Sequence, residues 1–313
     1  MILITGSTGF VGSALTQHLQ QQGYPLTAAV RRITDSFPPS IQQTPVGDLL
    51  PDTDWTTTLH NVDTIIHLAA QTPNRSTTAK QLNIVNHLAT LNLAQHAASK
   101  GVRRFIFLSS IKVSGEITQQ GERFKADNST SPTDPYGLSK YQAEQGLLKI
   151  ARQTGIEIVI IRPPLVYGAG VKGNFLSMMG WLQKGILLPL GNLHNQRSLV
   201  ALSNLIDLIT TCIDHPAAAN QTFLVSDGED LSTTELLQRL SKALGKPARL
   251  LPVPQKLLET TLNLLGKQSI AQRLCGNLQI DMIQTRELLS WTPPVSVDEA
   301  LQQTAQTYLQ ALR

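Results

Sequence analysis

The sequence has little cysteine and no cluster of metal-binding residues. Cys212 and Cys275 are the only cysteines among the 313 residues, and neither belongs to a Cys-x-x-Cys or mixed Cys/His motif. Disulfide frameworks and structural zinc sites both need several such residues at short, regular spacings. The sequence therefore argues against a disulfide framework and against a metal site, and it favours a reducing compartment.

Long apolar runs and dense basic runs are also missing. Stretches such as 158–161 and 186–190 are far shorter than a membrane span. No charged segment precedes an apolar one at the N-terminus, because residues 2–4 already have the pattern of a strand. The formal net charge is +4, but Lys and Arg are scattered. We therefore expect a cytoplasmic protein that neither spans a membrane nor binds nucleic acid.

The first twelve residues combine an apolar strand, a glycine-punctuated turn and the start of a helix. Gly6 suits a tight turn, Gly9 allows a pyrophosphate to approach the backbone, and Gly12 lets the helix lie close to the strand. The free N–H groups at the helix start favour an anion. A bare turn without a ligand is the alternative, but the strand before it and the helical spacing after it favour a dinucleotide site.

Further apolar runs at 26–30, 62–68 and 103–108 alternate with helical patterns, including 82–100, which ends at Gly101. This rhythm predicts an α/β fold, a Rossmann-like doubly wound parallel sheet that binds ligands at the carboxyl ends of its strands. Residues 34–45 resemble a surface loop, and 46–49 a short strand. His67 is expected to pack inside its strand. We expect a nucleotide-binding domain at 1–165 and a smaller C-terminal α/β substrate lobe at 166–313, with some exchange of strands.

The residues after the second strand bear on the choice of cofactor. An acidic side chain there would bind a ribose 2′-hydroxyl, but the sequence has Arg31 and Arg32, which suit a 2′-phosphate. Two solvated arginines at the start of a loop are the equally weighted alternative. The pattern therefore favours NADP over NAD without excluding NAD.

Tyr136 and Lys140 lie four residues apart, directly after an expected helix start at Asp134 and Pro135. This spacing places both side chains on one helical face. The ammonium and the helix dipole would favour the phenolate form of Tyr136, which could then exchange a proton with a substrate oxygen. A packed tyrosine beside a solvated lysine is the alternative, less favoured because the glycine turn accompanies the pair.

These segments together resemble the extended short-chain dehydrogenase/reductases of the NAD-dependent epimerase/dehydratase family. The matching segments are 5–12, 47–49, 67–70, Asn86, 109–115, Tyr136 with Lys140, and 162–168. The resemblance implies that Tyr136 is the catalytic acid/base, that Lys140 holds the nicotinamide ribose, and that Ser110 binds the reacting sugar oxygen. It places the cofactor against Gly6, Thr8, Gly9, Phe10, Val11, Gly12, Asp48, Leu49, Ala69, Ala70 and Pro163, in addition to the two arginines. Ser114 departs from the family pattern, in which tyrosine is common.

In the second lobe, the resemblance assigns the pyrophosphate of a nucleotide sugar to Asn174 and Arg197, with Arg273 as a third candidate. A guanidinium fork suits that group. The implied reaction is oxidoreduction at C4 of a nucleotide-diphosphate sugar such as a UDP-hexose or UDP-N-acetylhexosamine. We favour a 4-ketoreductase of surface-polysaccharide synthesis, with a 4-epimerase as the alternative. A dehydratase is disfavoured by Ile111-Lys112, and a non-catalytic NADP sensor by the presence of both Tyr136 and Lys140. A homodimer is among the expected assemblies.

Overall fold

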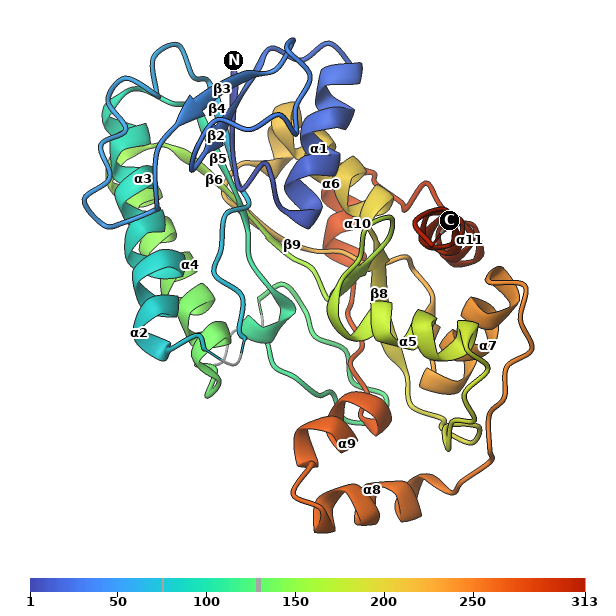
Figure 1. Ribbon diagram of the computed structural model, residues 1–313. Coiled ribbons are helices and arrows are strands. Elements are labelled where there is room, and N and C mark those ends of the chain that lie inside the picture. The colour runs from blue at the N-terminus through green and yellow to red at the C-terminus, as the bar shows by residue number, and fades with distance from the viewer. Residues whose placement is uncertain (75, 128–130, 313) are drawn as a thin grey trace.

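A computed structural model describes residues 1–74, 76–127 and 131–312. Its centre is a parallel sheet of seven strands in the order β3-β2-β1-β4-β5-β6-β9 (Figure 1). The strands are β1 (Ile2–Thr5), β2 (Leu26–Val30), β3 (Gln42–Pro45), β4 (Thr64–His67), β5 (Arg104–Leu108), β6 (Glu157–Arg162) and β9 (Gln221–Leu224). The strand order reverses between β1 and β4, which is where this class of sheet opens a crevice for a ligand.

Helices cover both faces of the sheet (Figure 1). One face carries α1 (Phe10–Gln21), α6 (Leu202–Asp214) and α10 (Ile283–Leu289), and the other carries α2 (Ala79–Leu82), η1 (Asn83–Leu88), α3 (Ala89–Ser99) and α4 (Pro135–Thr154). Side chains alternate along β1: Ile2 and Ile4 pack toward α1 and α6, whereas Leu3 packs toward α3 and α4. The predicted doubly wound, Rossmann-like α/β fold is confirmed.

The third strand lies at Gln42–Pro45, so the prediction of a strand at 46–49 and of a loop through Pro45 is wrong. β3 is an edge strand with partly exposed, polar residues, and it pairs in parallel with β2. An edge strand needs no apolar run, and proline is tolerated there, which is why the hydrophobic pattern missed it. Residues 46–49 follow the carboxyl end of β3 instead, which still brings Asp48 to the ligand edge of the sheet.

The long crossover helix is one continuous run from Ala79 to Ser99, but it contains a wide π-helical turn, η1. It begins three residues before the predicted Leu82, where Thr78 and Gln81 form a capping box. In the π-helical turn the buried Asn86 side chain accepts a hydrogen bond from the Gln71 amide at 2.7 Å and donates one to the Gln71 carbonyl at 3.0 Å. The turn therefore ties this helix to the loop after β4.

The smaller lobe has a three-stranded sheet of β7 (Leu165–Tyr167), β8 (Arg197–Ala201) and β10 (Asp230–Leu231). Around it lie α5 (Gly173–Gln183), α7 (Thr233–Ala243) and α11 (Val297–Gln310), which share a core of their own. The short helices η2 (Ile111–Val113) and η3 (Pro216–Ala218) connect larger elements. Because α6 and β9 return to the large sheet, the domain division at 165/166 with strand exchange stays a proposal.

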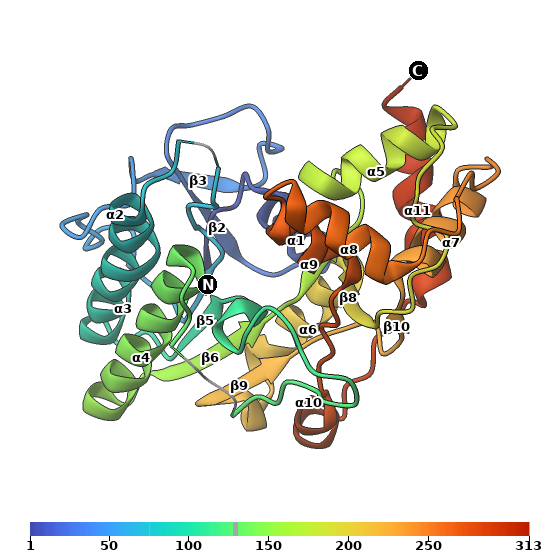
Figure 2. The same cartoon turned by 90° about the horizontal axis from the view of Figure 1, so that it is seen from below.

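Two further helices, α8 (Gln255–Leu264) and α9 (Gln268–Cys275), extend from this lobe as an arm (Figures 1 and 2). Within the described residues, no helix has both the length and the hydropathy needed to cross a bilayer.

Candidate active site

The turn between β1 and α1 forms a cradle that leaves no room for a side chain at Gly6 or Gly12. Gly6 has a φ of 70°, and a Cβ there would lie 2.6 Å from the backbone nitrogen of Ala69. A Cβ on Gly12 would lie 2.0 Å from the Gly6 carbonyl oxygen, so the helix can approach the strand only with glycine. Gly9 is the N-cap and supplies no side-chain acceptor to the first turn of α1. The free amides there suit an anion such as a pyrophosphate.

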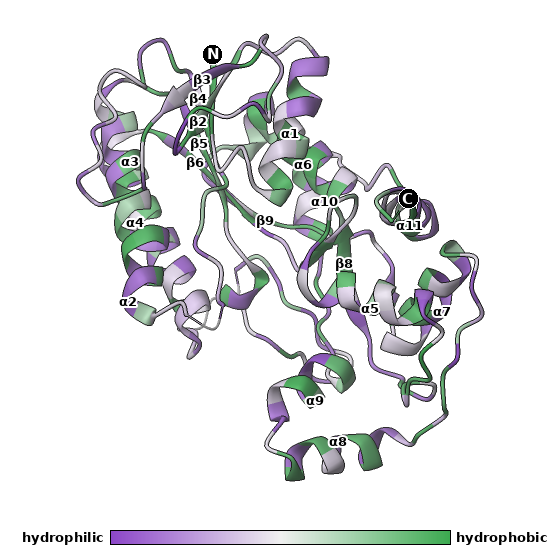
Figure 3. Ribbon diagram, viewed as in Figure 1, coloured by the Kyte–Doolittle hydropathy of each residue, from purple (hydrophilic) through white to green (hydrophobic). Residues whose placement is uncertain are grey.

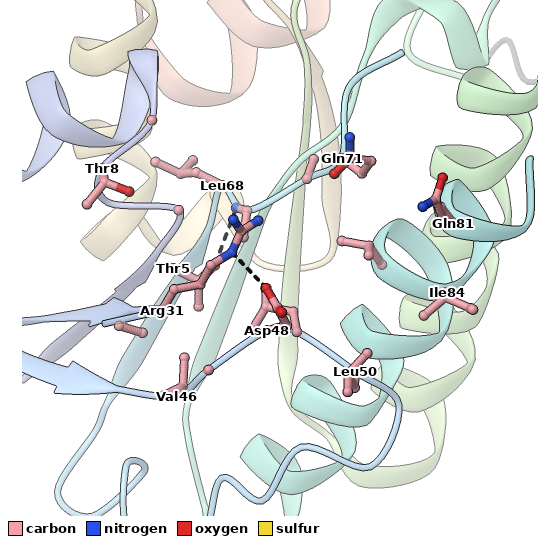
Figure 4. Close-up of a pocket in the computed structure, with 18 of the residues that line it drawn as sticks. Thr5, Thr8, Arg31, Val46, Asp48, Leu50, Leu68, Gln71, Gln81 and Ile84 are labelled. Atoms are coloured by element: carbon pink, nitrogen blue, oxygen red, sulfur yellow. Dashed lines mark hydrogen bonds and ion pairs between the residues drawn. The ribbon is translucent and has the colours of Figure 1, made fainter. Parts of the chain in front are cut away.

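A cavity of about 640 Å³ opens beside this cradle, at the carboxyl ends of β1, β2 and β4 (Figure 4). Eight of the predicted cofactor residues line it: Gly6, Thr8, Gly9, Arg31, Asp48, Leu49, Ala69 and Ala70. Its volume and its mixed polar and apolar lining suit a nucleotide-sized ligand. Within the described residues there is no group of three or more His, Cys, Asp or Glu side chains that could hold a metal ion.

The first residues of α1 do not line this cavity. Phe10 and Val11 are partly buried against the hydrophobic core, and Gly12 faces the strand. The opposite wall was not predicted from the sequence: it comprises Gln71, Asn74, Ser76, Thr77, Gln81, Ile84 and Val85, from the loop after β4 and from α2 and η1. The capping box at Thr78 and Gln81 is the sequence signal that could have located this wall.

Arg31 and Asp48 form an ion pair across the mouth of the cavity, with Nε 2.9 Å from Oδ1 (Figure 4). Both side chains are largely exposed, at 77% and 73%. Arg32 lines a neighbouring depression together with Arg31, Thr8 and Gly47. The guanidinium of Arg31 therefore already has an anionic partner, and a 2′-phosphate bound there would lie near the Asp48 carboxylate.

Ser110 and Pro163 follow the ends of the adjacent strands β5 and β6. The Ile111 amide donates to the Pro163 carbonyl at 3.0 Å, which holds the two chain segments together. Ser110 caps η2 by accepting a hydrogen bond from the Lys112 amide at 3.3 Å. Both predicted residues thus lie at the carboxyl edge of the sheet.

Helix α4 begins as predicted, with Asp134 as its N-cap and Pro135 in the first turn. Asp134 accepts a hydrogen bond from the Gly137 amide at 3.1 Å. A Cβ on Gly137 would lie 3.2 Å from the Lys112 carbonyl oxygen, so the first turn of α4 packs against the segment that Ser110 caps. Tyr136 therefore lies beside η2, and it is half-buried.

Lys140 is fully buried one turn further along α4. Its ammonium donates to the Leu108 carbonyl at 2.9 Å and lies 4.5 Å from the centre of the Phe107 ring. Burial lowers the pKa of Lys140 to about 7, although the nearby Glu144 carboxylate acts in the opposite direction. Lys140, Ser110 and Pro163 are thus gathered at the ends of β5 and β6.

The prediction that Tyr136 has a phenolate-favouring environment is wrong for this arrangement. Burial, and then the charge of Asp134, raise the pKa of Tyr136 to about 12. The Lys140 ammonium instead points at the end of β5, where the Leu108 carbonyl accepts its hydrogen bond. Sequence spacing gives a shared helical face but not the direction in which a long side chain reaches.

A buried polar network behind this site was not predicted. The Arg162 guanidinium binds Glu144 through both arms, with Nε–Oε1 at 3.0 Å and Nη2–Oε2 at 2.6 Å, and Ser109 also donates to Glu144. Arg162 also donates to Ser114 at 3.1 Å. Glu144 follows Lys140 by four residues and Tyr136 by eight, so the helical period was the signal that could have located it.

The predicted substrate arginines lie together in the second lobe. Arg197, the first residue of β8, donates to the Gly276 carbonyl at 3.0 Å, and burial and the charge of Arg273 lower its pKa. Among the residues described, neither guanidinium lies within ion-pair distance of a carboxylate. Asn174 is exposed on the first turn of α5, and no hydrogen bond between described residues joins it to either arginine. The arginine pair is an environment that an anion would stabilise.

Comparisons with known proteins establish the family of the chain. A sequence model of the NAD dependent epimerase/dehydratase family matches residues 2–226. A UDP-glucose 4-epimerase of Vibrio cholerae is 47% identical over 316 residues, covering 99% of this chain and 96% of the relative.

Solved structures share the fold at lower identity. A UDP-glucose 4-epimerase of Thermotoga maritima with UDP-glucose aligns at a TM-score of 0.77 and 20% identity, covering 100% of this chain and 99% of that one. A UDP-glucuronic acid 4-epimerase of Bacillus cereus in complex with NAD aligns at 0.78 and 19%, with the same coverage. The chain described here belongs to the NAD dependent epimerase/dehydratase family.

Proposed function

We propose that this protein is an NAD-dependent 4-epimerase of a UDP-hexose, with UDP-glucose or UDP-N-acetylglucosamine as the first candidates. The observation that carries the proposal is the gathering of Ser110 and Lys140 at the ends of β5 and β6, with Tyr136 one turn away. The Vibrio cholerae relative supports the epimerase over the ketoreductase that we favoured from the sequence.

The glycine cradle and the cavity beside it fit a dinucleotide. Gly6, Gly9 and the first amides of α1 would hold its pyrophosphate, since any Cβ at Gly12 or Gly6 would collide with backbone. Asp48 and Leu49 would contact the adenosine of the dinucleotide, and Ala69 and Ala70 would line the cavity beneath it. When bound, the nicotinamide would supply the hydride acceptor and donor that oxidation and reduction at C4 of the sugar require.

We favour NAD because the ion pair with Asp48 already neutralises Arg31 at the cavity mouth. A 2′-phosphate would have to share the guanidinium with that carboxylate. The NADP preference remains the competing hypothesis, supported by Arg32 and by the absence of an acidic residue directly after β2.

The side chains of this protein would manage the proton at the C4 oxygen. Ser110 would donate a hydrogen bond to that oxygen, and Tyr136 would accept its proton during oxidation and return one during reduction. Burial and the charge of Asp134 raise the pKa of Tyr136 to about 12, so the phenol would be the proton donor of the reductive half. Lys140, buried at the end of β5, would hold the nicotinamide ribose.

Arg197 and Arg273 would bind the pyrophosphate of the sugar nucleotide from the second lobe. The partly desolvated guanidinium of Arg197 and the exposed one of Arg273, neither with a carboxylate partner in the described chain, provide charge-assisted donors for an anion. Asn174, exposed on α5, would contribute a hydrogen bond when substrate is present.

The purified protein should convert UDP-glucose to UDP-galactose, or UDP-N-acetylglucosamine to its C4 epimer, without added cofactor. Product separation by anion exchange reads this directly, and Tyr136→Phe is the matched inactive control. Identification of the nucleotide released on denaturation gives the cofactor. Turnover that depends on stoichiometric NADPH and a UDP-4-keto-sugar would support the second candidate, a 4-ketoreductase, and would contradict the epimerase.

A further inference from the structure

The arm formed by α8 and α9 carries apolar residues that the described parts of the chain leave uncovered. Helix α8 has no buried residue, although it contains four leucines and is followed by a fifth. The exposed fractions of Leu257, Leu264 and Leu265 are 58%, 84% and 63%. Leucines exposed to this extent on one short segment mark an interaction surface.

These leucines form one stripe. Leu257, Leu258, Thr261, Leu264 and Leu265 follow at i, i+1, i+4, i+7 and i+8, which is the spacing of one helical face. Figure 3 shows apolar residues along α8 alternating with polar ones. Of the helices, α8 packs chiefly against α9, and the arm lies away from the seven-stranded sheet (Figure 1). The helix is therefore amphipathic, and much of its apolar face is open.

The neighbouring strand segments extend this surface. The Leu188 amide donates to the Arg249 carbonyl at 2.9 Å, and the Leu251 amide donates to the Leu188 carbonyl at 2.8 Å. This pairing places the exposed Ile186 and Leu187 beside the exposed Leu251, just before α8. Apolar side chains thus continue from the arm onto the edge of the second lobe.

The same segment holds the excess positive charge of the protein. Residues 246–275 contain five exposed basic residues and one acidic residue, a net charge of +4. The formal net charge of all 313 residues is also +4, so the rest of the chain is neutral overall. The basic residues are Lys246, Arg249, Lys256, Lys267 and Arg273, and the acidic one is Glu259.

We propose that the arm docks on the surface of an anionic lipid bilayer, with the stripe of Leu257, Leu264 and Leu265 inserted among the headgroups. Apolar side chains on a short helix flanked by lysines are the features that bind such an interface without crossing it. The charge complements anionic lipid. It opposes a second copy of the chain as the occupant, because a twofold contact would place the same basic segment against itself.

This inference does not rest on the proposed reaction, because none of these leucines lines the cofactor cavity. It does bear on where the reaction would occur. Arg273 lies on α9, so a docked arm would hold the second lobe, with its arginine pair, close to the membrane surface.

The test is co-sedimentation of the full-length protein with phosphatidylcholine vesicles that contain or lack phosphatidylglycerol, at low and high salt. We expect binding only with phosphatidylglycerol, and weakening by salt. The triple variant Leu257→Gln, Leu264→Gln, Leu265→Gln should lose most of the bound fraction, because glutamine keeps the helix but removes the apolar stripe. Lys256→Gln with Lys267→Gln should lower the partition coefficient by about tenfold or more.

Matched controls separate the arm from the rest of the surface. Ile283→Gln with Leu312→Gln removes two apolar side chains elsewhere that are as exposed as Leu257, and Lys100→Gln with Lys149→Gln removes two exposed lysines near α3 and α4. Both control variants should bind like the parent, and thermal melting should confirm that all variants fold. Absence of sedimentation with anionic vesicles, or equal loss in the controls, would overturn the proposal. Concentration-dependent dimerisation abolished by the triple leucine variant would overturn it in favour of a second copy.

Discussion

The two ends of the proposed substrate path differ in how deeply their polar side chains are buried. We call the nicotinamide end, with Lys140, Glu144 and Arg162, the rigid end, and the sugar-nucleotide end, with Asn174 and Arg273, the adaptable end. At the nicotinamide end, Lys140, Glu144 and Arg162 are almost fully buried, and each has a charged or carbonyl partner within the protein. At the sugar-nucleotide end, Arg273 and Asn174 are exposed, and α8 buries nothing. Buried partners fix positions to the accuracy that proton transfer needs, whereas exposed groups can adapt to a ligand that enters from solvent.

The largest expected effect is the loss of turnover in Tyr136→Phe, at the rigid end. Loss of the phenol should reduce turnover roughly 10²–10⁴-fold, because it removes general acid/base help while the cavity is unchanged. Cofactor affinity, measured by calorimetry, should stay near that of the parent, since Tyr136 does not line the main cavity. A variant with the parent's kcat would show that another group moves the proton.

Glu144→Gln tests whether burial at this end stabilises the fold. The substitution leaves the buried Arg162 guanidinium without its carboxylate, which typically costs about 3–5 kcal/mol. Urea unfolding measures the loss. Glu116→Gln is the control, because its ion pair with Lys112 is partly exposed and should contribute under about 1 kcal/mol. Equal losses in the two variants would remove the contrast between buried and exposed pairs.

His67 makes the stability of the rigid end depend on pH. Its ring lies between the hydroxyls of Thr5 at 2.7 Å and Thr90 at 2.9 Å, and burial, helped by the charge of Lys140, lowers its pKa to about 3. In the unfolded chain the His67 imidazole takes up a proton near pH 6.5, whereas in the folded protein it stays neutral until about pH 3. Stability should therefore fall as pH drops through this window, by ~1.4 kcal/mol per pH unit.

Unfolding free energies measured between pH 6.5 and the acid limit of folding would test this. His67→Gln keeps a donor and an acceptor for the two threonines but cannot take up the proton, so it should flatten the slope. His60→Gln, at an exposed position, should not. Parallel slopes for the parent and His67→Gln would show that the acid sensitivity arises elsewhere.

Arg197→Ala probes the adaptable end. In addition to its hydrogen bond with the Gly276 carbonyl, the guanidinium should pair with the substrate pyrophosphate and not with the cofactor, so KM should rise by an amount equivalent to about 1.5–3 kcal/mol, while cofactor Kd stays constant. Arg152→Ala, on the exposed end of α4, is the control. A raised cofactor Kd with unchanged KM would remove Arg197 from the substrate site.

The glycine turn was predicted from the sequence for a physical reason. Gly6 and Gly12 were located because close backbone contact restricts those positions to glycine, and this constraint is visible in the chain. The strand β3 was misplaced because an exposed edge strand leaves no hydrophobic period.

Other features depend on contacts between distant residues, which spacing alone does not reveal. Lys140 reaches back to Leu108, and Glu144 meets Arg162 across the sheet edge, so neither the raised pKa of Tyr136 nor the buried pair was predicted. Arg197 and Arg273 were named separately by resemblance, but their proximity is a property of the fold.

Substitution of Arg31 has the smallest expected effect on stability, because its side chain is exposed at the edge of the cofactor cavity. Its ion pair with Asp48 should contribute under about 1 kcal/mol to stability. If NAD is the cofactor, the double variant Arg31→Ala, Arg32→Ala should bind NADH within a few-fold of the parent. If these arginines select a 2′-phosphate, the same variant should lose roughly ten- to a hundredfold in NADPH affinity, and the loss should shrink at high salt. Fluorescence titrations of both cofactors, with Arg152→Ala as the control, decide between these outcomes. A parent protein that prefers NADPH, and a double variant that does not, would contradict the NAD proposal and restore the 4-ketoreductase.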